Sequence, residues 1–195
     1  MTQTDMTIAR KAMIDSQLRT SGVNQEFVLA RMNSVAREEF IPDAVKPLAY
    51  MDRAIPLGEG QYLPSPVVHG KMLSEAAPRL ADTVLVVENG ASYLAELLRP
   101  LVSSVETMSA QDAVGKPRGR KTYSLILIDG AVEELSSALE KRLEDGGRIV
   151  TGVVTRGVTR LASGRKVAGN VALQPFAEIG IPVLAMFAKT KSWSF

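Results

Sequence analysis

Residues 84–93 read VLVVENGASY, and this stretch decides the fold class of the chain. Its first four residues are apolar and three of them are valine, which is typical of a central parallel strand buried on both faces. Gly90 follows shortly after the valines, and Ser92 stands where the N-cap of a helix is expected. A strand that turns through a glycine into a helix is a unit of α/β proteins, so this stretch predicts that class.

The stretches that follow extend this unit into a sheet. Residues 123–129 read YSLILID and form the strongest predicted strand, whereas residues 132–143 predict an amphipathic helix and residues 107–122 a loop. The predicted strands are residues 83–87, 102–106, 123–129 and 148–154, followed by antiparallel strands at 158–163, 166–173 and 183–188. We therefore expect a three-layer, Rossmann-like α/β fold with helices on both faces and an antiparallel carboxyl-terminal edge.

The amino-terminal part of the chain has a different pattern. Residues 5–34 carry apolar side chains at helical spacing and predict two helices, and residues 67–77 predict another. Prolines and glycines between them keep residues 55–66 in a loop. We expect residues 1–78 to form a helical extension and residues 79–195 the sheet domain, the two making one compact unit.

Composition limits the possible functions. The chain has 195 residues, 46% of them apolar, which predicts one ordinary domain with a sizeable core. Cysteine is absent and His69 is the single histidine, so disulfides, thiolate metal sites and most histidine-based chemistry are excluded, and no metal site is predicted. A net charge of +2 gives no argument for an anionic partner. The polar amino end and the lack of an uncharged apolar run of ~18 residues predict a cytoplasmic protein without a membrane span.

Four stretches outside the first one carry a resemblance to a known family. Residues 13–19 read MIDSQLR, residues 35–42 read VAREEFIP, residues 55–61 read IPLGEGQ, and residues 143–150 read LEDGGRIV. In this order they resemble the protein-L-isoaspartate O-methyltransferase family, as a divergent and shortened bacterial member. The resemblance covers nearly the whole chain. It implies a class I methyltransferase fold, S-adenosylmethionine as the cofactor, and isoaspartyl residues of damaged proteins as the substrate.

The resemblance places the cofactor loop at residues 88–92. The family's G-x-G-x-G positions read Glu88, Gly90 and Ser92 here, so only the middle glycine remains. By resemblance, Gly90 and Tyr93 are the candidate cofactor-binding residues of this loop; the alternative is a plain turn that needs one glycine. Glu88 would bring a negative charge beside the cofactor's carboxylate, at a cost on the order of 1–4 kcal/mol. We therefore expect weakened binding of S-adenosylmethionine.

The second strand and the loop after it supply two more cofactor candidates. Glu106 ends the strand, where Rossmann-like proteins hold ribose hydroxyls with a carboxylate; the alternative is an exposed glutamate at a strand end. Sixteen residues separate Glu106 from Tyr123, too few for the helix and third strand that the resemblance implies. We expect this strand and helix pair to be missing. Asp112 is interpreted as a remnant of the family's Gly-Asp-Gly turn.

The loop that faces the substrate in the family is altered as well. Where the family has G-Q-T-I-S-Q-P, residues 60–66 read GQYLPSP, so Pro64 takes the place of the hydroxyl-bearing serine. Ser65 is the candidate catalytic residue if the loop shifts by one position; the alternative is an ordinary loop serine. His69 follows at the start of a helix and is expected to be a surface or hydrogen-bonded histidine.

These changes leave three readings of function. The first is a carboxyl methyltransferase, which needs positioning and desolvation rather than acid–base groups, because the sulfonium is already activated. The second is a non-catalytic descendant of the fold that serves as a binding or assembly module. The third, nucleic-acid binding, depends only on four basic residues of the loop, Lys116, Arg118, Arg120 and Lys121, for which a solvated loop is the more ordinary explanation.

The missing strand also makes a prediction about assembly. Without it, residues 102–106 lie at the edge of the sheet, and a bare edge presents unpaired backbone groups. The basic loop with Lys116 and Arg118 is one means of protecting this edge. We favour the other, a symmetric homodimer packed on this side.

Overall fold

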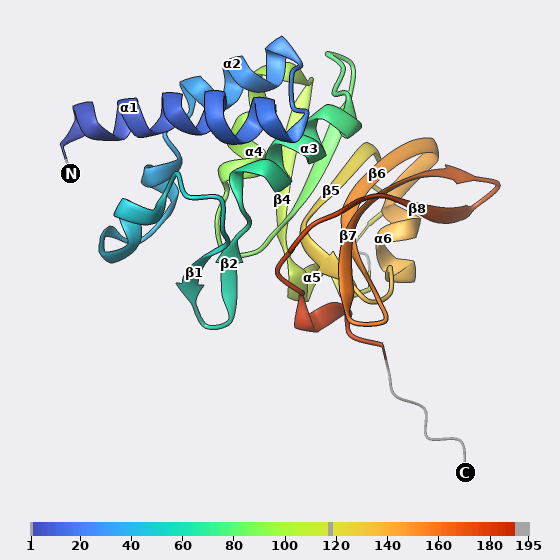
Figure 1. Ribbon diagram of the computed structural model, residues 1–195. Helices are drawn as coiled ribbons and strands as arrows, with labels where there is room; N and C mark the ends of the chain where they lie inside the picture. The colour runs from blue at the N-terminus through green and yellow to red at the C-terminus, as the bar shows by residue number, and fades with distance from the viewer. Residues whose placement is uncertain (1, 117–118, 190–195) are drawn as a thin grey trace.

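A single six-stranded sheet forms the centre of the protein, in the computed structural model, which describes residues 2–116 and 119–189 (Figure 1). The strand order is β4-β3-β5-β6-β7-β8. Their bounds are β3 (Thr83–Glu88), β4 (Ser104–Ser109), β5 (Tyr123–Val132), β6 (Leu143–Thr155), β7 (Val158–Val167) and β8 (Asn170–Glu178). The first four strands pair in parallel, and β7 and β8 are antiparallel. This confirms the predicted α/β fold with its antiparallel carboxyl-terminal side.

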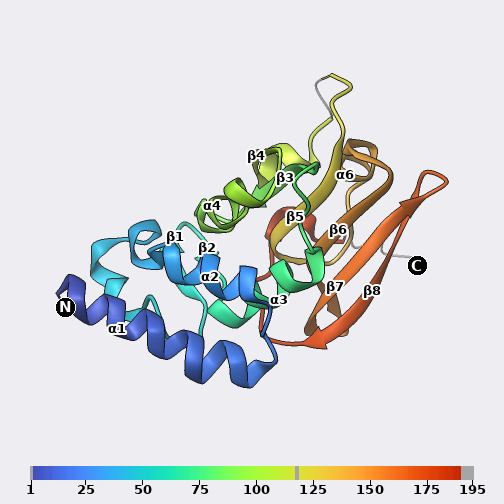
Figure 2. The same ribbon diagram turned by 90° about the horizontal axis from the view of Figure 1, so that it is seen from above.

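Helices cover both faces of the sheet, as predicted. On one face α3 (Pro66–Ala76) and α4 (Tyr93–Leu98) pack on apolar side chains that alternate along β3 and β5. On the opposite face α5 (Ala110–Val114) and α6 (Ser137–Arg142) pack on the intervening side chains. Seen from above in Figure 2, α4 and α6 flank the strands on opposite sides. Within the described part of the chain, no helix combines the length and apolarity needed to cross a membrane.

The amino-terminal extension is helical, as expected. It contains α1 (Gln3–Met13), a π-helical turn (Ile14–Leu18), three 3-10 turns (Arg19–Ser21, Arg37–Phe40 and Asp43–Leu48) and α2 (Glu26–Ser34). The hydrophobic core continues without interruption from Met6 of α1 to Ile181, so the extension and the sheet share one core. The boundary at residue 78 stays a prediction.

The predicted loop at 55–66 is partly regular. Residues Ile55–Gly58 form β1 and Gln61–Leu63 form β2, and the two strands pair as an antiparallel hairpin. The sharp turn between them takes two glycines with left-handed backbone angles, Gly58 and Gly60. This hairpin projects beyond the carboxyl ends of the central strands (Figure 1).

The helix predicted over residues 132–143 is wrong in its first half. β5 continues to Val132 because Ala131 and Val132 pair with β6, and α6 begins only at Ser137. The strand predicted at 183–188 is also wrong. Val183 makes one isolated parallel bridge to Ala131, and the chain then enters a 3-10 turn at Ala185–Phe187. In both places, long-range strand pairing overrides the local pattern: β5 pairs with β6 in the first, and Val183 with β5 in the second.

The loop predicted at 107–122 is shorter than expected. β4 extends to Ser109, and Ser109 caps the five-residue helix α5 by accepting a hydrogen bond from Asp112 N at 3.1 Å. No third parallel strand stands beyond β4 in the described part of the sheet, so β4 is the edge strand, as the missing strand and helix pair predicts. Arg118 lies outside the described residues.

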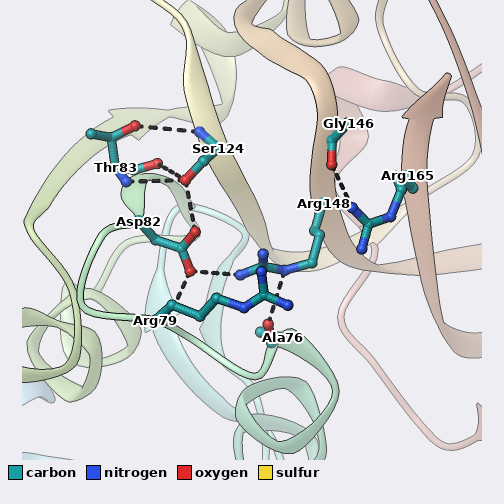
Figure 3. A network of polar contacts seen from close by, with 8 residues as sticks. All are labelled: Ala76, Arg79, Asp82, Thr83, Ser124, Gly146, Arg148 and Arg165. Carbon is teal, nitrogen blue, oxygen red and sulfur yellow. Dashed lines mark hydrogen bonds and ion pairs between the residues drawn. The ribbon is translucent and has the colours of Figure 1, made fainter. Parts of the chain in front are cut away.

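The amino ends of the parallel strands are tied together by one carboxylate (Figure 3). Asp82 accepts hydrogen bonds from Ser124 Oγ at 2.8 Å and Arg148 Nη2 at 2.6 Å, and also from the backbone N–H of Arg79 at 2.8 Å. Burial opposes ionisation of Asp82, but these hydrogen bonds outweigh it and lower its pKa. This clamp fixes β3, β5 and β6 at the end of the sheet opposite to the loops described next.

Candidate functional site

The carboxyl ends of β3 and β5 form the base of the candidate site. The strands run in register, with Val87 opposite Ile128, so Glu88 and Asp129 are neighbours at the next position. Gly90 follows β3 with φ +92°, a left-handed angle that side chains other than glycine rarely adopt. The side chain of Gln61 lies directly over it, since a Cβ atom on Gly90 would stand 2.7 Å from Gln61 Oε1. The β1–β2 hairpin therefore covers the turn after β3.

A cleft of about 590 Å³ opens between the hairpin, the turn after β3 and the start of α5. We call it the loop cleft, and its lining residues are Glu59–Gln61, Glu88–Gly90, Ser109–Gln111 and Val183–Met186. This position, beyond the carboxyl ends of parallel strands, is where α/β proteins bind ligands. Its volume lies in the range of small-molecule sites.

One wall of the loop cleft comes from the carboxyl-terminal segment, residues 181–187. Ala131 N donates to Pro182 O at 2.8 Å, and Leu184 N donates to Ala131 O at 2.9 Å. Leu184 packs so closely on Gly130 that a Cβ atom there would stand 2.7 Å from Leu184 Cγ. The segment then turns beside α5, where Figure 1 shows it in red. A glycine is therefore required at position 130, because the two chain segments approach each other closely there. Residues 181–187 also narrow the loop cleft.

Three polar atoms at this end of the sheet have no hydrogen-bond partner among the described residues, although they are shielded from solvent. They are Glu88 Oε1, Asn89 Nδ2 and Asp129 Oδ2. Burial raises the pKa of Glu88, and the negative charge of Asp129 raises it further. Buried polar groups usually have partners, so these atoms indicate a place where a bound group completes the structure.

Beneath the strand ends lies a buried polar network that the sequence did not reveal. Arg37 Nη1 lies 2.9 Å from His69 Nδ1, and His69 Nε2 lies 2.7 Å from Asp129 Oδ1. The guanidinium of Arg37 also donates to Ala49 O at 2.9 Å and to Pro64 O, and it stacks 5.0 Å from the ring centroid of Tyr93. This network joins the extension, the loop before α3 and the end of β5.

The protonation state of His69 follows from its partners. A guanidinium only donates hydrogen bonds, so Nδ1 of His69 accepts and Nε2 carries the hydrogen that is donated to Asp129. Burial lowers the pKa of His69 and the charge of Arg37 lowers it further, whereas Asp129 opposes this shift. The lone pair of His69 is used by Arg37. His69 therefore orients Asp129 and is not placed to act as a base toward a ligand.

Ser65 lies on a second cleft, of about 710 Å³, which we call the hairpin cleft. The other lining residues are Asp52–Ala54, Tyr62 and Ile179–Val183. Ser65 is 5% exposed and occupies the N-cap position of α3, but its hydroxyl caps no amide of that helix. The hydroxyl is therefore free for another partner. The hairpin cleft and the loop cleft share Val183 as a common boundary.

Glu106 and Asp112 line a third cleft, of about 880 Å³, beside β4. Glu106 accepts hydrogen bonds from Lys121 Nζ and Tyr123 Oη, which lower its pKa. Asp112 Oδ2 accepts from Ser109 Oγ at 2.8 Å. Both carboxylates thus have partners from the chain. Glu88, Ser109 and Gln111 line this cleft as well as the loop cleft.

The structure brings some of the predicted site residues together and separates others. Gly90 lines the loop cleft, and Glu106 and Asp112 share the cleft beside β4. Tyr93 is fully buried, and its ring packs against Arg37 and Phe40. The sequence reading missed the roles of Arg37, His69 and Asp129 as one unit; only the position of Asp129 after the strongest strand hinted at it. Among residues 2–116 and 119–189, no group of three acidic, histidine or cysteine side chains is placed to hold a metal ion.

Comparisons of the sequence with known proteins point to one family. Residues 8–115 match the family model of protein-L-isoaspartate(D-aspartate) O-methyltransferase. A relative from Koribacter versatilis, a protein-L-isoaspartate O-methyltransferase, is 31% identical over 192 residues, covering 86% of each chain. A relative of the same description from Methanoculleus marisnigri is 28% identical, covering 91% of this chain and 92% of its own.

A solved structure shows the same fold. It is the crystal structure of a Plasmodium falciparum chain assigned as a protein-L-isoaspartate O-methyltransferase, in complex with S-adenosyl-L-homocysteine. The TM-score is 0.73 at 13% identity, and the match covers 91% of this chain and 98% of the other. At this identity the likeness concerns the fold, whereas the family model and the relatives concern the sequence. Together they show that this chain belongs to the protein-L-isoaspartate O-methyltransferase family.

Proposed function

We propose that this chain is an S-adenosylmethionine-dependent methyltransferase of isoaspartyl carboxylates in proteins, with weakened cofactor binding. The observation that carries the proposal is the loop cleft, which lies at the carboxyl end of β3 beside the left-handed Gly90 in a member of this family. The cofactor supplies an activated methyl group, so the chain has to bind and orient its ligands rather than move protons. The cytoplasm is the compartment that we propose, and a homodimer the assembly.

Glu88 and Asn89 of the loop cleft, with Asp129 buried beside them, fit the positive charge of the cofactor. Glu88 Oε1 and Asp129 Oδ2 are unpartnered acceptors within the described chain, and Asn89 Nδ2 is an unpartnered donor. Asn89 and Gly90 would hold the cofactor at the turn after β3. The network of His69 and Arg37 holds Asp129 at the neighbouring end of β5.

Three features support weakened binding. Glu88 stands where the cofactor's own carboxylate would approach, and its raised pKa reflects how poorly this environment accepts negative charge. Gln61 lies on Gly90, and residues 183–186 narrow the cleft from the other side. A ligand has to displace or accommodate these groups, which reduces the net free energy of binding.

The hairpin cleft is the proposed position of the isoaspartyl peptide. Ser65 lies at its wall with a hydroxyl that caps no helix amide within the described chain, so it can donate to a substrate oxygen. Arg37 binds Pro64 O and thereby fixes the preceding residue of the loop. Ser65 therefore has the role of orienting the carboxylate toward the neighbouring loop cleft.

A second candidate function, a non-catalytic binding or assembly module, is supported by the cleft beside β4. Glu106, the proposed ribose ligand, is bound by Lys121 and Tyr123 instead. Pro64 has no hydroxyl at the position of the family's serine. A protein that uses this fold for binding other molecules, and not for catalysis, would tolerate these changes.

Calorimetry with S-adenosylmethionine distinguishes the two candidates. The first predicts binding that is measurable but weaker than low micromolar, and methyl transfer to an isoaspartyl peptide under saturating cofactor. Glu88→Gly should tighten binding of the cofactor if repulsion of its carboxylate is the main defect. The absence of binding heat and of a thermal shift at high concentrations of the cofactor would favour the non-catalytic module. A dissociation constant in the low micromolar range would contradict the weakened binding of the cofactor.

A further inference from the structure

The carboxyl ends of β3 and β5 hold two acidic side chains that lie on the same face of the sheet. Val84 and Val86 of β3 and Leu125 and Leu127 of β5 belong to the core beneath α3 and α4. Side chains alternate along a strand, so Glu88 and Asp129 continue these two rows onto that same face. Strands in register bring their Cα atoms to about 4.8 Å.

The two carboxylates are neighbours, and each has one buried oxygen without a hydrogen-bond partner among the described residues. Asp129 is 1% exposed, and His69 takes only its Oδ1, which leaves Oδ2 unpaired among the described residues. Glu88 Oε1 is likewise shielded and unpaired in that part of the chain. Among the described residues, Arg99 is the one cation that lowers the pKa of Glu88, and its effect is smaller than those of burial and Asp129. Two adjacent acids in such surroundings favour a positive charge between them.

Asn89 gives an independent sign that a ligand belongs here. Its side chain is 5% exposed and lines the loop cleft together with Glu88. Its Nδ2 has no acceptor among the residues that the structure describes. A buried amide donor of this kind needs an acceptor on the bound group. The cleft is therefore complementary to a cation that carries a hydrogen-bond acceptor nearby.

We propose that Glu88, which lines the loop cleft, and Asp129, which is buried beside it, form a charge-recognition site that selects ligands with an organic cation, a sulfonium or an ammonium centre. His69 and Arg37 are positioning residues for this site, because they hold Asp129 through its other oxygen. The identity of the ligand rests on the proposed function, whereas its positive charge is inferred from the two carboxylates alone. The site favours S-adenosylmethionine over S-adenosylhomocysteine, which has the same groups without the sulfonium charge.

Calorimetry with the two compounds tests this selectivity through a ratio of affinities, which is separate from the absolute affinity. The wild-type protein should bind S-adenosylmethionine about tenfold more tightly than S-adenosylhomocysteine. Glu88→Gln and Asp129→Asn should each bring this ratio close to one. The matched control is Glu26→Gln, which removes an exposed acid in the first turn of α2, away from the three clefts, and should leave the ratio unchanged. Equal affinities in the wild type, or a ratio that Glu88→Gln does not change, would overturn the proposal.

A small probe separates this inference from the proposed function. Trimethylsulfonium chloride should raise the melting temperature of the wild-type protein relative to sodium chloride at the same ionic strength, and Glu88→Gln should remove the difference. Stabilisation by this probe without binding of S-adenosylmethionine would support the charge site and contradict the proposed function. Binding of both nucleosides with equal affinity, and no effect of the probe, would leave the proposed function standing and refute the charge site. In that case Glu88 is protonated, and the proton explains how two acidic side chains can lie next to each other.

Discussion

His69 Nε2 lies 2.7 Å from Asp129 Oδ1, and both side chains are buried at the centre of the molecule. The contact joins α3 to the end of β5. Arg37 extends this series, because its guanidinium donates a hydrogen bond to the other ring nitrogen of His69. Since a buried charge is stable only with partners, each member of this series depends on the other two.

Replacing His69 by leucine should lower the free energy of unfolding by about 3–5 kcal/mol, the range for breaking a buried ionic network. The change removes the acceptor for Arg37 and the donor for Asp129 together. Chemical denaturation monitored by circular dichroism measures the loss. His69→Gln is the control, since an amide can replace one of the two hydrogen bonds and should cost less. Equal losses for the two variants would indicate that packing alone, and not the hydrogen bonds, matters here.

The contribution of Asp82 to stability should depend on pH. Its pKa is lowered from 3.8 in the folded protein, so the stabilisation is present above 3.8 and is lost as the pH falls through the lowered value. Asp82→Asn should cost about 1.5–3 kcal/mol at neutral pH, as expected for hydrogen bonds to a charged group, and much less in strong acid. Melting temperatures of both proteins across this range provide the measurement. A difference that stays constant down to strong acid would contradict the ionic role of the clamp in Figure 3.

Gly90→Ala should destabilise the protein for two separable reasons. The left-handed backbone costs about 1–2 kcal/mol, and the new methyl group collides with Gln61. Gly60→Ala is the matched control, because its φ is +74° and no described atom beyond its chain neighbours lies within 4 Å of the added carbon. Adding Gln61→Ala to Gly90→Ala should recover only part of the collision, because the Cβ atom of residue 61, at 2.8 Å, remains. If Gly90→Ala and Gly60→Ala cost the same, the contact with Gln61 has no energetic weight.

Ser65→Ala should reduce methyl transfer to an isoaspartyl peptide by roughly a hundredfold, as for other donors that orient a reacting oxygen. Its melting temperature should change little, since Ser65 caps no amide of α3. Ser136→Ala should show the reverse pattern, because Ser136 does cap α6 and accepts from Leu139 N at 3.3 Å; it should cost about 1 kcal/mol and spare turnover. Unchanged turnover in Ser65→Ala would remove Ser65 from the site.

The edge strand β4 should be covered by a second subunit. Light scattering at micromolar concentration should give twice the 21.0 kDa mass of one chain. Thr107→Lys places a charge on this edge and should shift the protein toward the monomer, whereas Gln174→Lys on β8, at the other end of the sheet, should not. A wild-type monomer would mean that the loop after β4 protects the edge by itself.

The sequence predicted the central strands well because their apolar residues are consecutive. β3 and β5 are buried on both faces, and such runs stand out from any surface pattern. It also predicted the edge position of β4 from a simple count of residues. The start of the helix after β5 was predicted wrongly, because Val132 pairs with β6 and the backbone N–H groups of Glu133 and Glu134 donate to Phe187 O.

The candidate site was harder to predict, for a physical reason. Arg37, His69 and Asp129 are separated by 32 and 60 residues, and no local pattern links them. Each looks ordinary alone, and their relationship exists only after α3 packs against β5. Gly90 could be placed at the turn after β3 because a strand followed by a glycine is a local signal. Glu106 was predicted at the end of its strand, but β4 continues to Ser109, and the binding of Glu106 by Lys121 depends on a loop whose course the sequence does not specify.

The pairing of residues 181–187 with Ala131 has a consequence for how the protein is made. During synthesis every strand of the sheet leaves the ribosome before this segment does, so a nascent chain can assemble its sheet while Gly130 is still uncovered. The loop cleft gains its last wall only when the segment emerges and docks. A ligand of that cleft therefore cannot assist the early folding of the nascent chain, and any stabilisation that it gives begins after the sheet has formed.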